Sequence, residues 1–298
     1  MRRVANWREA LTVVAFLSPA LALIAVFSVG PAVWAVVQSF TNRSLTGLTA
    51  MSPSFVGLDN YERLLADGDF YTSLLRTVVF VFFSAVVGQT LFAFLIAYLM
   101  AERPQWKLRA TPIFAGIFVL PLAVPETVAA LTWASMANGT EAGFANRIIQ
   151  PLGAGPVQWL RDYAMETITV VNVWRGLSFA MVLFAAALEG IPRDILEASM
   201  VDGATAWQQL RRVTIPMLRP QILMFLMLTT ITTFGIFGLV YFLTRGGPGN
   251  VTEIIGIYIY EQAFQFFEIG YGSAAGVLLL VVLLILGINY VRLMRDQV

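Results

Sequence analysis

The chain has 298 residues, of which 58% are hydrophobic and only 12% are charged, and its net charge is +1. A soluble domain carries about 25% charged residues, so this chain lacks the polar surface of a soluble fold, and it has no basic run that would bind nucleic acid. The absence of cysteine and histidine excludes thiolate nucleophiles and imidazole bases, and no metal site is predicted.

Six apolar segments are long enough to cross a bilayer, which takes about 20 residues. They are residues 11–39, 73–100, 110–134, 167–189, 220–243 and 274–294. The first segment is longer than the apolar core of a signal peptide, about 7–15 residues, so we expect it to remain as a membrane anchor. The sequence predicts an all-α polytopic membrane protein with six transmembrane helices, forming a single transmembrane domain over residues 1–298.

The distribution of basic residues predicts how these spans are oriented. Arginine and lysine are more frequent on the cytoplasmic segments of membrane proteins than on the outer ones. Most of the 19 basic residues lie at the N-terminus, between the second and third spans, in residues 190–219 and at the C-terminus. We therefore expect both termini and the segment 190–219 to be cytoplasmic.

Two charged residues lie inside predicted spans. Glu126 belongs to the third span and Arg175 to the fourth. Each is about ten residues, or about 15 Å, from the outer end of its helix. Ionisable side chains within a membrane are costly and are usually paired or functional. The similar depth predicts a salt bridge, which either locks two spans together or lines the substrate path.

Proline and hydroxyl residues mark the third and fifth spans. Pro121 and Pro125 are expected to bend the third span, as a hinge or as static kinks. The fifth span carries several threonines beside Phe237. Hydroxyls next to aromatic faces suit a sugar, although threonines also hydrogen-bond within helix bundles. The candidate substrate path comprises Glu126, Asn172, Trp174, Arg175, Thr230, Thr233 and Phe237.

Residues 190–219 form a polar interval between two apolar runs. Apolar residues near helical spacing predict a first helix over residues 193–201. Asp202-Gly203 predicts a turn, because glycine accepts a left-handed backbone. A second helix is expected over residues 204–213, with a proline stop at Pro216. The interval is either a docking element or an amphipathic connector that lies on the lipid headgroups.

The order of residues in this interval resembles the EAA loop of ABC importer permeases. The resemblance rests on Glu197, Ala198, Ser199, Gly203, Val213, Ile215 and Pro216. Ser199 stands where the family usually has a second alanine, and both residues are small. Residues 55–61, 244–248, 258–264 and 270–274 resemble the outer loops of the sugar and glycerol-phosphate branch of that family. The resemblance covers nearly the whole chain.

Membership of this family implies a mechanism and partners. Two permease subunits pair, and each sends its EAA helix into a groove on one of two cytoplasmic ATPase subunits. ATP and magnesium act on those ATPases, so this chain binds no cofactor and is not an enzyme. An extracellular or periplasmic solute-binding protein delivers the substrate. The expected location is the bacterial cell membrane, where the multi-pass chain contacts lipid.

The resemblance also implies roles for individual residues of the coupling loop. Glu197 is expected to contact a basic group of the ATPase. Ala198, Ser199 and Ala204 keep the surface small, and Gly203 allows the bend. Asp202 is expected to cap the second helix by accepting a backbone N–H.

A rival interpretation is an ion-coupled secondary carrier. Such a carrier usually places carboxylates in several spans, whereas Glu126 is almost alone here. The chain also lacks a phosphate-binding loop, because Lys107 is its single lysine and has no glycine-rich segment before it. ATP dependence therefore separates the two interpretations.

Overall fold

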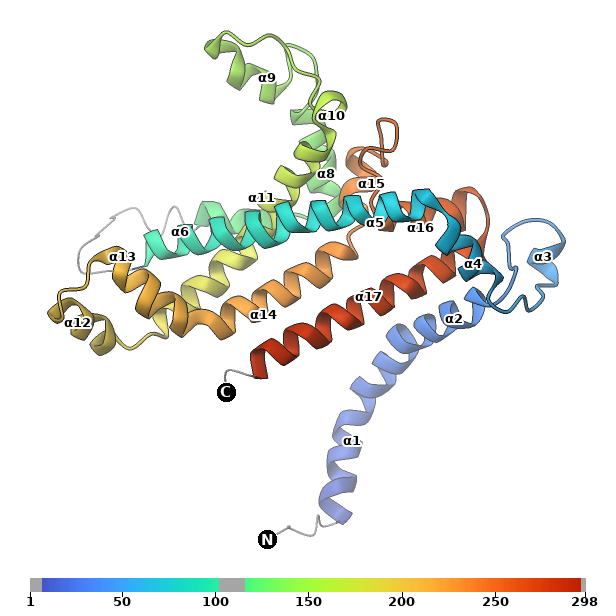
Figure 1. Cartoon of the computed structure of the whole chain (residues 1–298), viewed down its shortest axis with the longest axis horizontal. Helices are drawn as coiled ribbons and strands as arrows, with labels where there is room; N and C mark the ends of the chain where they lie inside the picture. Colours follow the sequence, from blue (N-terminus) through green and yellow to red (C-terminus); the bar gives the residue numbers. More distant parts are fainter. Residues whose placement is uncertain (1–6, 102–115, 296–298) are drawn as a thin grey trace. The chain divides into compact units, whose positions relative to one another are not determined.

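The computed structural model describes residues 7–101 and 116–295, and almost all of them are helical (Figure 1). Five helices are long and apolar enough to cross a membrane, and a bent pair makes a sixth possible span. These are Thr12–Ser39, Gly68–Met100, Ala164–Glu189, Ala206–Phe234 and Ile269–Met294, and the pair Gly116–Ala123 with Glu126–Met136. The predicted all-α, multi-span architecture is confirmed.

Several residues used to predict the orientation lie outside the described part of the chain. They are Arg2, Arg3, Arg103, Lys107 and Arg109. Residues 110–115, at the start of the predicted third span, also lie outside it. The cytoplasmic placement of both termini stays a prediction. The single transmembrane domain over residues 1–298 also stays a prediction.

The chain forms two compact units, one of residues 1–67 with 259–280 and one of residues 68–258 with 281–298. In unit 1 the first span has a π-helical turn in its middle. Unit 1 contains α1 (Trp7–Ile24), the π-helix η1 (Ala25–Val29), α2 (Gly30–Ser39), α3 (Leu48–Met51), α4 (Asp59–Ala66), η6 (Glu261–Gln265) and the start of α17 (Ile269–Arg295). The π-turn directly precedes Gly30-Pro31, where proline lacks the N–H of a regular turn.

A buried asparagine organises unit 1. The Asn60 side-chain amide donates to the backbone carbonyls of Ser39 at 2.9 Å and Thr41 at 2.8 Å. The hydroxyl of Tyr61 lies 2.6 Å from that of Ser39. These contacts explain why an Asn-Tyr pair follows the first span, because together they hold the start of α4 against the end of α2.

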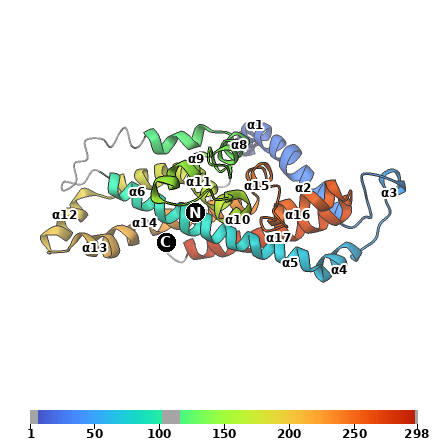
Figure 2. The same ribbon diagram turned by 90° about the horizontal axis from the view of Figure 1, so that it is seen from above.

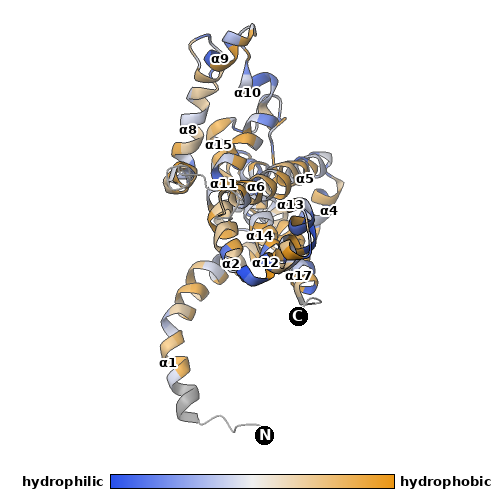
Figure 3. Cartoon of the chain, turned by 90° about the vertical axis from the view of Figure 1, so that its left-hand side faces the viewer, coloured by the Kyte–Doolittle hydropathy of each residue, from blue (hydrophilic) through white to orange (hydrophobic). Residues whose placement is uncertain are grey.

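Unit 2 contains the remaining helices. They are α5 (Gly68–Val81), the π-helix η2 (Phe82–Phe92), α6 (Ala93–Met100), η3 (Leu120–Ala123), α8 (Glu126–Met136), α9 (Phe144–Ile149), η4 (Gln150–Leu152), α10 (Trp159–Asp162), α11 (Ala164–Glu189), α12 (Arg193–Val201), α13 (Ala206–Gln209), η5 (Leu210–Thr214), α14 (Ile215–Phe234) and α15 (Gly238–Leu243). α16 (Ile255–Tyr260) and α17 contribute residues to both units. Hydrophilic residues gather in connecting segments such as α10, while the long helices are mainly apolar (Figure 3).

The core of unit 2 lies between α6, α11 and α14, which run close together (Figure 1). Ala93 and Ala97 are buried on α6, where small side chains allow the helix backbones to approach. Phe184 of α11 is fully buried, and its ring lies 5.2 Å from that of Phe225 on α14, edge to face. This packing holds α11 and α14, which both line the cavity described below, against each other.

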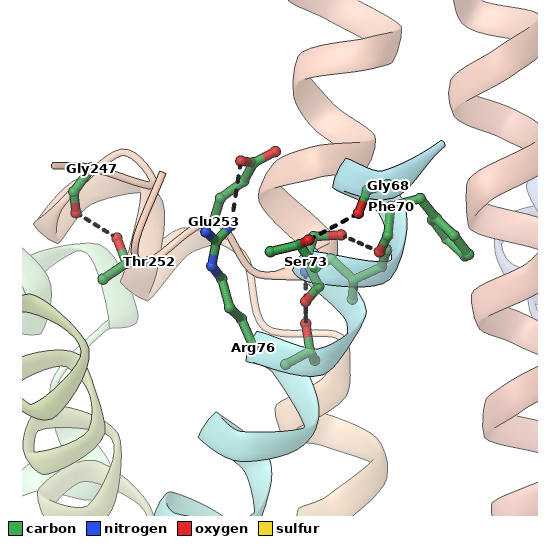
Figure 4. A network of polar contacts seen from close by, with 10 residues as sticks. Gly68, Phe70, Ser73, Arg76, Gly247, Thr252 and Glu253 are labelled. Atoms are coloured by element: carbon green, nitrogen blue, oxygen red, sulfur yellow. Dashed lines mark hydrogen bonds and ion pairs between the residues drawn. The ribbon is translucent and has the colours of Figure 1, made fainter. Parts of the chain in front are cut away.

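The loop over residues 244–254 is anchored to α5 (Figure 4). Arg76 and the buried Glu253 form an ion pair with 3.9 Å between their nearest atoms. The Thr77 hydroxyl accepts a hydrogen bond of 2.7 Å from the backbone N–H of Ile255. Thr252 donates to the carbonyl oxygen of Gly247 at 2.7 Å and so closes the glycine-rich turn. The loop that contains the sequence T-R-G-G-P is thus held against the third turn of α5.

Candidate functional site: a cavity at two broken spans and the hairpin α12–α13

The fifth span is broken at the level of the cavity. The prediction of one helix over residues 220–243 is wrong, because α14 ends at Phe234 and α15 begins at Gly238. Gly235 and Gly238 flank the break, and glycine is a weak helix former. Irregular backbone within a membrane is tolerated where protein buries it or where it lines a cavity.

The third span is also broken. The helical segment Gly116–Ala123 and α8 meet at an angle of 112°. Val124 between them is extended, with φ −86° and ψ 121°, as the residue before Pro125 is expected to be. The predicted bend is therefore confirmed, and the described part of the third span consists of two helices rather than one.

Both breaks face one cavity of about 570 Å³ within unit 2. It is lined by the second, third, fourth and fifth spans. The lining residues are Gln89, Pro121, Leu122, Glu126, Asn172, Arg175, Gly176, Phe179, Phe225, Leu228, Thr229, Thr232, Thr233, Gly235, Ile236, Phe237 and Gly238. This volume is within the usual range of small-molecule sites, about 300–1,000 Å³.

Glu126 and Arg175 are the charged side chains among these lining residues. Oε2 of Glu126 lies 3.7 Å from Nη2 of Arg175, and both side chains are about one-third exposed. The predicted pairing of the two is confirmed. Oε1 of Glu126 also accepts a hydrogen bond of 2.6 Å from the backbone N–H of Leu239, at the start of α15.

Gln89 is a polar residue of the site that the sequence did not indicate. Its side chain is buried, donates to the carbonyl oxygen of Asn172 at 3.0 Å and accepts from the hydroxyl of Thr229 at 2.5 Å. The Asn172 amide in turn donates to the hydroxyl of Ser84 at 2.9 Å. A Cβ on Gly176 would overlap the Gln89 amide, so glycine there makes room for it. One amide thus links the second, fourth and fifth spans.

Five of the seven predicted path residues line the cavity and two do not. The lining members are Glu126, Asn172, Arg175, Thr233 and Phe237. Trp174 instead packs edge to face on Trp133, with 5.6 Å between ring centroids. The hydroxyl of Thr230 lies 3.3 Å from that of Tyr290. These two residues therefore do not line this cavity, because successive residues of a helix point in different directions, and their place in the substrate path stays a prediction.

The chemistry of the cavity wall suits a polyhydroxylated ligand. Phe179, Phe225 and Phe237 offer ring faces or edges, and Thr232 and Thr233 offer hydroxyls. In the part of the chain that the structure describes, His, Cys, Asp and Glu side chains do not gather in threes to hold a metal ion.

The first helix of the hairpin over residues 193–209 is where the sequence predicted it. α12 runs from Arg193 to Val201 after Pro192. Gly203 follows with φ +79°, which confirms the predicted bend. α12 and α13 form a hairpin beyond the ends of α6 and α14 (Figures 1 and 2).

The second helix of the hairpin differs from the prediction at both ends. Its N-terminal cap is Thr205, which exchanges hydrogen bonds with Gln208, so the predicted capping role of Asp202 is wrong. Thr205 directly precedes the first helical residue, which is the position from which a side chain can cap. The prediction that the second helix ends at Pro216 is also wrong, because one continuous helix runs from Ala206 to Phe234. The π-turn η5 ends two residues before Pro216 and accommodates the missing N–H.

Gln209 joins the two helices of the hairpin. Its side-chain amide donates to the Leu196 carbonyl at 2.9 Å and to the Ser199 hydroxyl at 2.8 Å. Ser199 therefore has a partner that alanine would lack. The opposite surface is exposed, with 87% of Val201 and 67% of Trp207 accessible. Exposed apolar side chains on such a hairpin are suited to contact another protein or the membrane surface.

The chain is similar to curated transport proteins over nearly its whole length. It is 32% identical over 292 residues to the trehalose/maltose transport system permease protein of Thermococcus litoralis, covering 97% of this chain and 96% of that protein. It is 30% identical over 294 residues to the sulfoquinovosyl glycerol transport system permease protein of Agrobacterium fabrum, covering 97% and 92%.

A solved structure shares the fold. A chain of a bacterial alginate ABC transporter, solved in complex with an alginate pentasaccharide-bound periplasmic protein, matches with a TM-score of 0.79 at 20% identity, covering 99% of this chain and 98% of that one. The family model described as the inner membrane component of binding-protein-dependent transport systems matches residues 2–296. The chain is a membrane-spanning member of this family of binding-protein-dependent transport system inner membrane components.

Proposed function

We propose that this chain forms half of the membrane path of an ATP-driven importer for a carbohydrate or a related polyol phosphate. The observation that carries the proposal is the cavity at the two broken spans. Its wall combines aromatic rings, threonine hydroxyls and the Glu126–Arg175 pair. Two related permeases are named for trehalose/maltose and for sulfoquinovosyl glycerol, which supports a sugar-like substrate.

The proposed complex contains a second permease, two ATPase subunits and a solute-binding protein. The hairpin α12–α13 passes the motion of the ATPases to the spans, because α13 is continuous with α14, whose C-terminal end lines the cavity. ATP and magnesium are used by the ATPase subunits. Transport then rests on switching between two arrangements of the spans and not on chemistry within this chain.

Glu197 provides a direct test of docking. It lies exposed on α12, where it can meet a basic group of the ATPase. We expect Glu197→Lys to weaken retention of the ATPase about tenfold, because like charges repel across an interface. The measurement is the amount of ATPase that co-purifies with the tagged chain in mild detergent.

Glu141→Lys is the matched control, since Glu141 is also exposed but lies between α8 and α9, far from the hairpin in sequence. The proposal predicts full retention in this control. Equal loss of the ATPase in both variants, or in neither, would contradict docking through α12.

A further inference from the structure

The break in the fifth span leaves the first backbone N–H groups of α15 without partners inside the helix. Such groups are unsatisfied at every helix N-terminus, and leaving one unpaired at this depth is costly. The N–H of the buried Leu239 donates to Oε1 of Glu126 at 2.6 Å. Glu126 itself is the first residue of α8. One carboxylate therefore joins the two helices that resume after the breaks.

The two contacts of this carboxylate differ in kind. The contact with the backbone N–H of Leu239 is short enough to be a hydrogen bond. The distance of 3.7 Å to Nη2 of Arg175 exceeds the usual length of an N–H···O hydrogen bond, about 2.7–3.2 Å. The direct bond is thus with the backbone of α15. The guanidinium of Arg175 therefore interacts with this carboxylate mainly through charge.

Gly238 gives independent support, because its position leaves room for the carboxylate. A Cβ on Gly238 would lie 3.1 Å from Oε1 of Glu126, closer than an ordinary van der Waals contact. A Cβ on Gly235, at the other side of the break, would have its nearest neighbours at 3.8 Å or more. The two glycines therefore offer a matched pair of substitutions that change no charge.

We propose that Glu126 is a positioning residue whose carboxylate caps α15 and thereby sets the place of Phe237 and Gly238 in the cavity wall. The ion pair with Arg175 is the weaker of its two contacts. The capping interaction is inferred from the geometry at the two breaks. Only its effect on transport rests on the proposed function. Both Glu126 and Arg175 line the cavity, and Glu126 in addition sets the position of α15.

Hydrogen–deuterium exchange of the complete purified transporter tests the cap, because exchange reports local opening. We expect Glu126→Ala and Gly238→Ala to speed exchange of the amides of residues 238–241 about tenfold, the effect of losing a hydrogen bond to a charged group. Glu126→Gln keeps an acceptor oxygen, Arg175→Met keeps the carboxylate, and Gly235→Ala keeps the space. All three should exchange at close to the wild-type rate.

Unchanged exchange in Glu126→Ala and Gly238→Ala would overturn the cap. Equal loosening in Arg175→Met would overturn it too, since the ion pair would then hold α15. Uptake separates this proposal from the proposed function: Gly238→Ala should raise the KM for substrate several-fold with a smaller change in kcat. Faster exchange with an unchanged KM would leave the cap standing and remove the cavity from the substrate path.

Discussion

Replacing Gly203 with proline is expected to abolish substrate-stimulated ATP hydrolysis and to reduce uptake by about 5- to 150-fold, the usual range for a lost coupling between sites. Gly203 has φ +79°, whereas proline is fixed near −65°. Its N–H also donates to the Met200 carbonyl at 3.0 Å, and proline has no N–H to donate. The hairpin between α12 and α13 would therefore lose its shape, while the spans would still insert.

The surroundings of Gly203 make the result interpretable. A Cβ there would meet no atom within 4 Å, so the backbone angle and not crowding decides the outcome. Gly203→Asn is the matched control, because asparagine tolerates the left-handed region. We expect it to keep most of the stimulated ATPase activity of the reconstituted complex. Normal stimulation in Gly203→Pro would show that the bend does not transmit the motion.

The second large effect is expected on uptake, when a larger side chain fills the cavity. Thr232→Trp should reduce uptake by at least about tenfold, a barrier increase of about 1.4 kcal/mol, because the indole would occupy space that the substrate needs. Thr232 lines the cavity from α14 and is exposed within this chain, so a larger side chain has room to enter the cavity without disturbing the core. The measurement is uptake of labelled carbohydrate into vesicles that hold equal amounts of assembled transporter.

Met224→Trp serves as the control for this substitution. Met224 lies on the same helix, is 45% exposed and does not line the cavity. Its variant should transport at a rate close to the wild type. If both variants transport normally, the cavity is not the substrate path. If both fail, the tryptophan damages α14 and not the path.

Features that depend on composition or on one local residue could be predicted from the sequence. Six apolar runs predicted six spans, and the described residues contain five such helices and the bent pair, since a bilayer requires a minimum length of apolar helix. The equal depth of Glu126 and Arg175 predicted that they would approach each other, and they do. Gly203 has the left-handed backbone that an Asp-Gly pair suggests.

Features that depend on contacts between distant segments could not be predicted. Hydropathy is as high across residues 235–237 as on either side, so it does not mark the break of the fifth span. The partners of Gln89 lie 83 and 140 residues away in sequence. The glutamine in an otherwise apolar run was the available signal, because a buried amide needs partners.

Local capping was predicted at the wrong residue for a related reason. Asp202 and Thr205 are both residue types that cap helix N-termini well. Which of them caps the helix depends on the residue at which the helix begins. The structure begins α13 at Ala206, so Thr205 caps it. The continuation through Pro216 depends on the preceding π-turn, which residue propensities do not indicate.

The measurement that tests the central claim most directly is uptake by the complete transporter in liposomes, with the solute-binding protein outside and nucleotide inside. We expect uptake of carbohydrate that requires ATP hydrolysis and stops with a non-hydrolysable analogue. The chain alone should transport nothing. Solute movement by the chain alone in ATP-free liposomes, driven by an ion gradient, would contradict the account and indicate a secondary carrier.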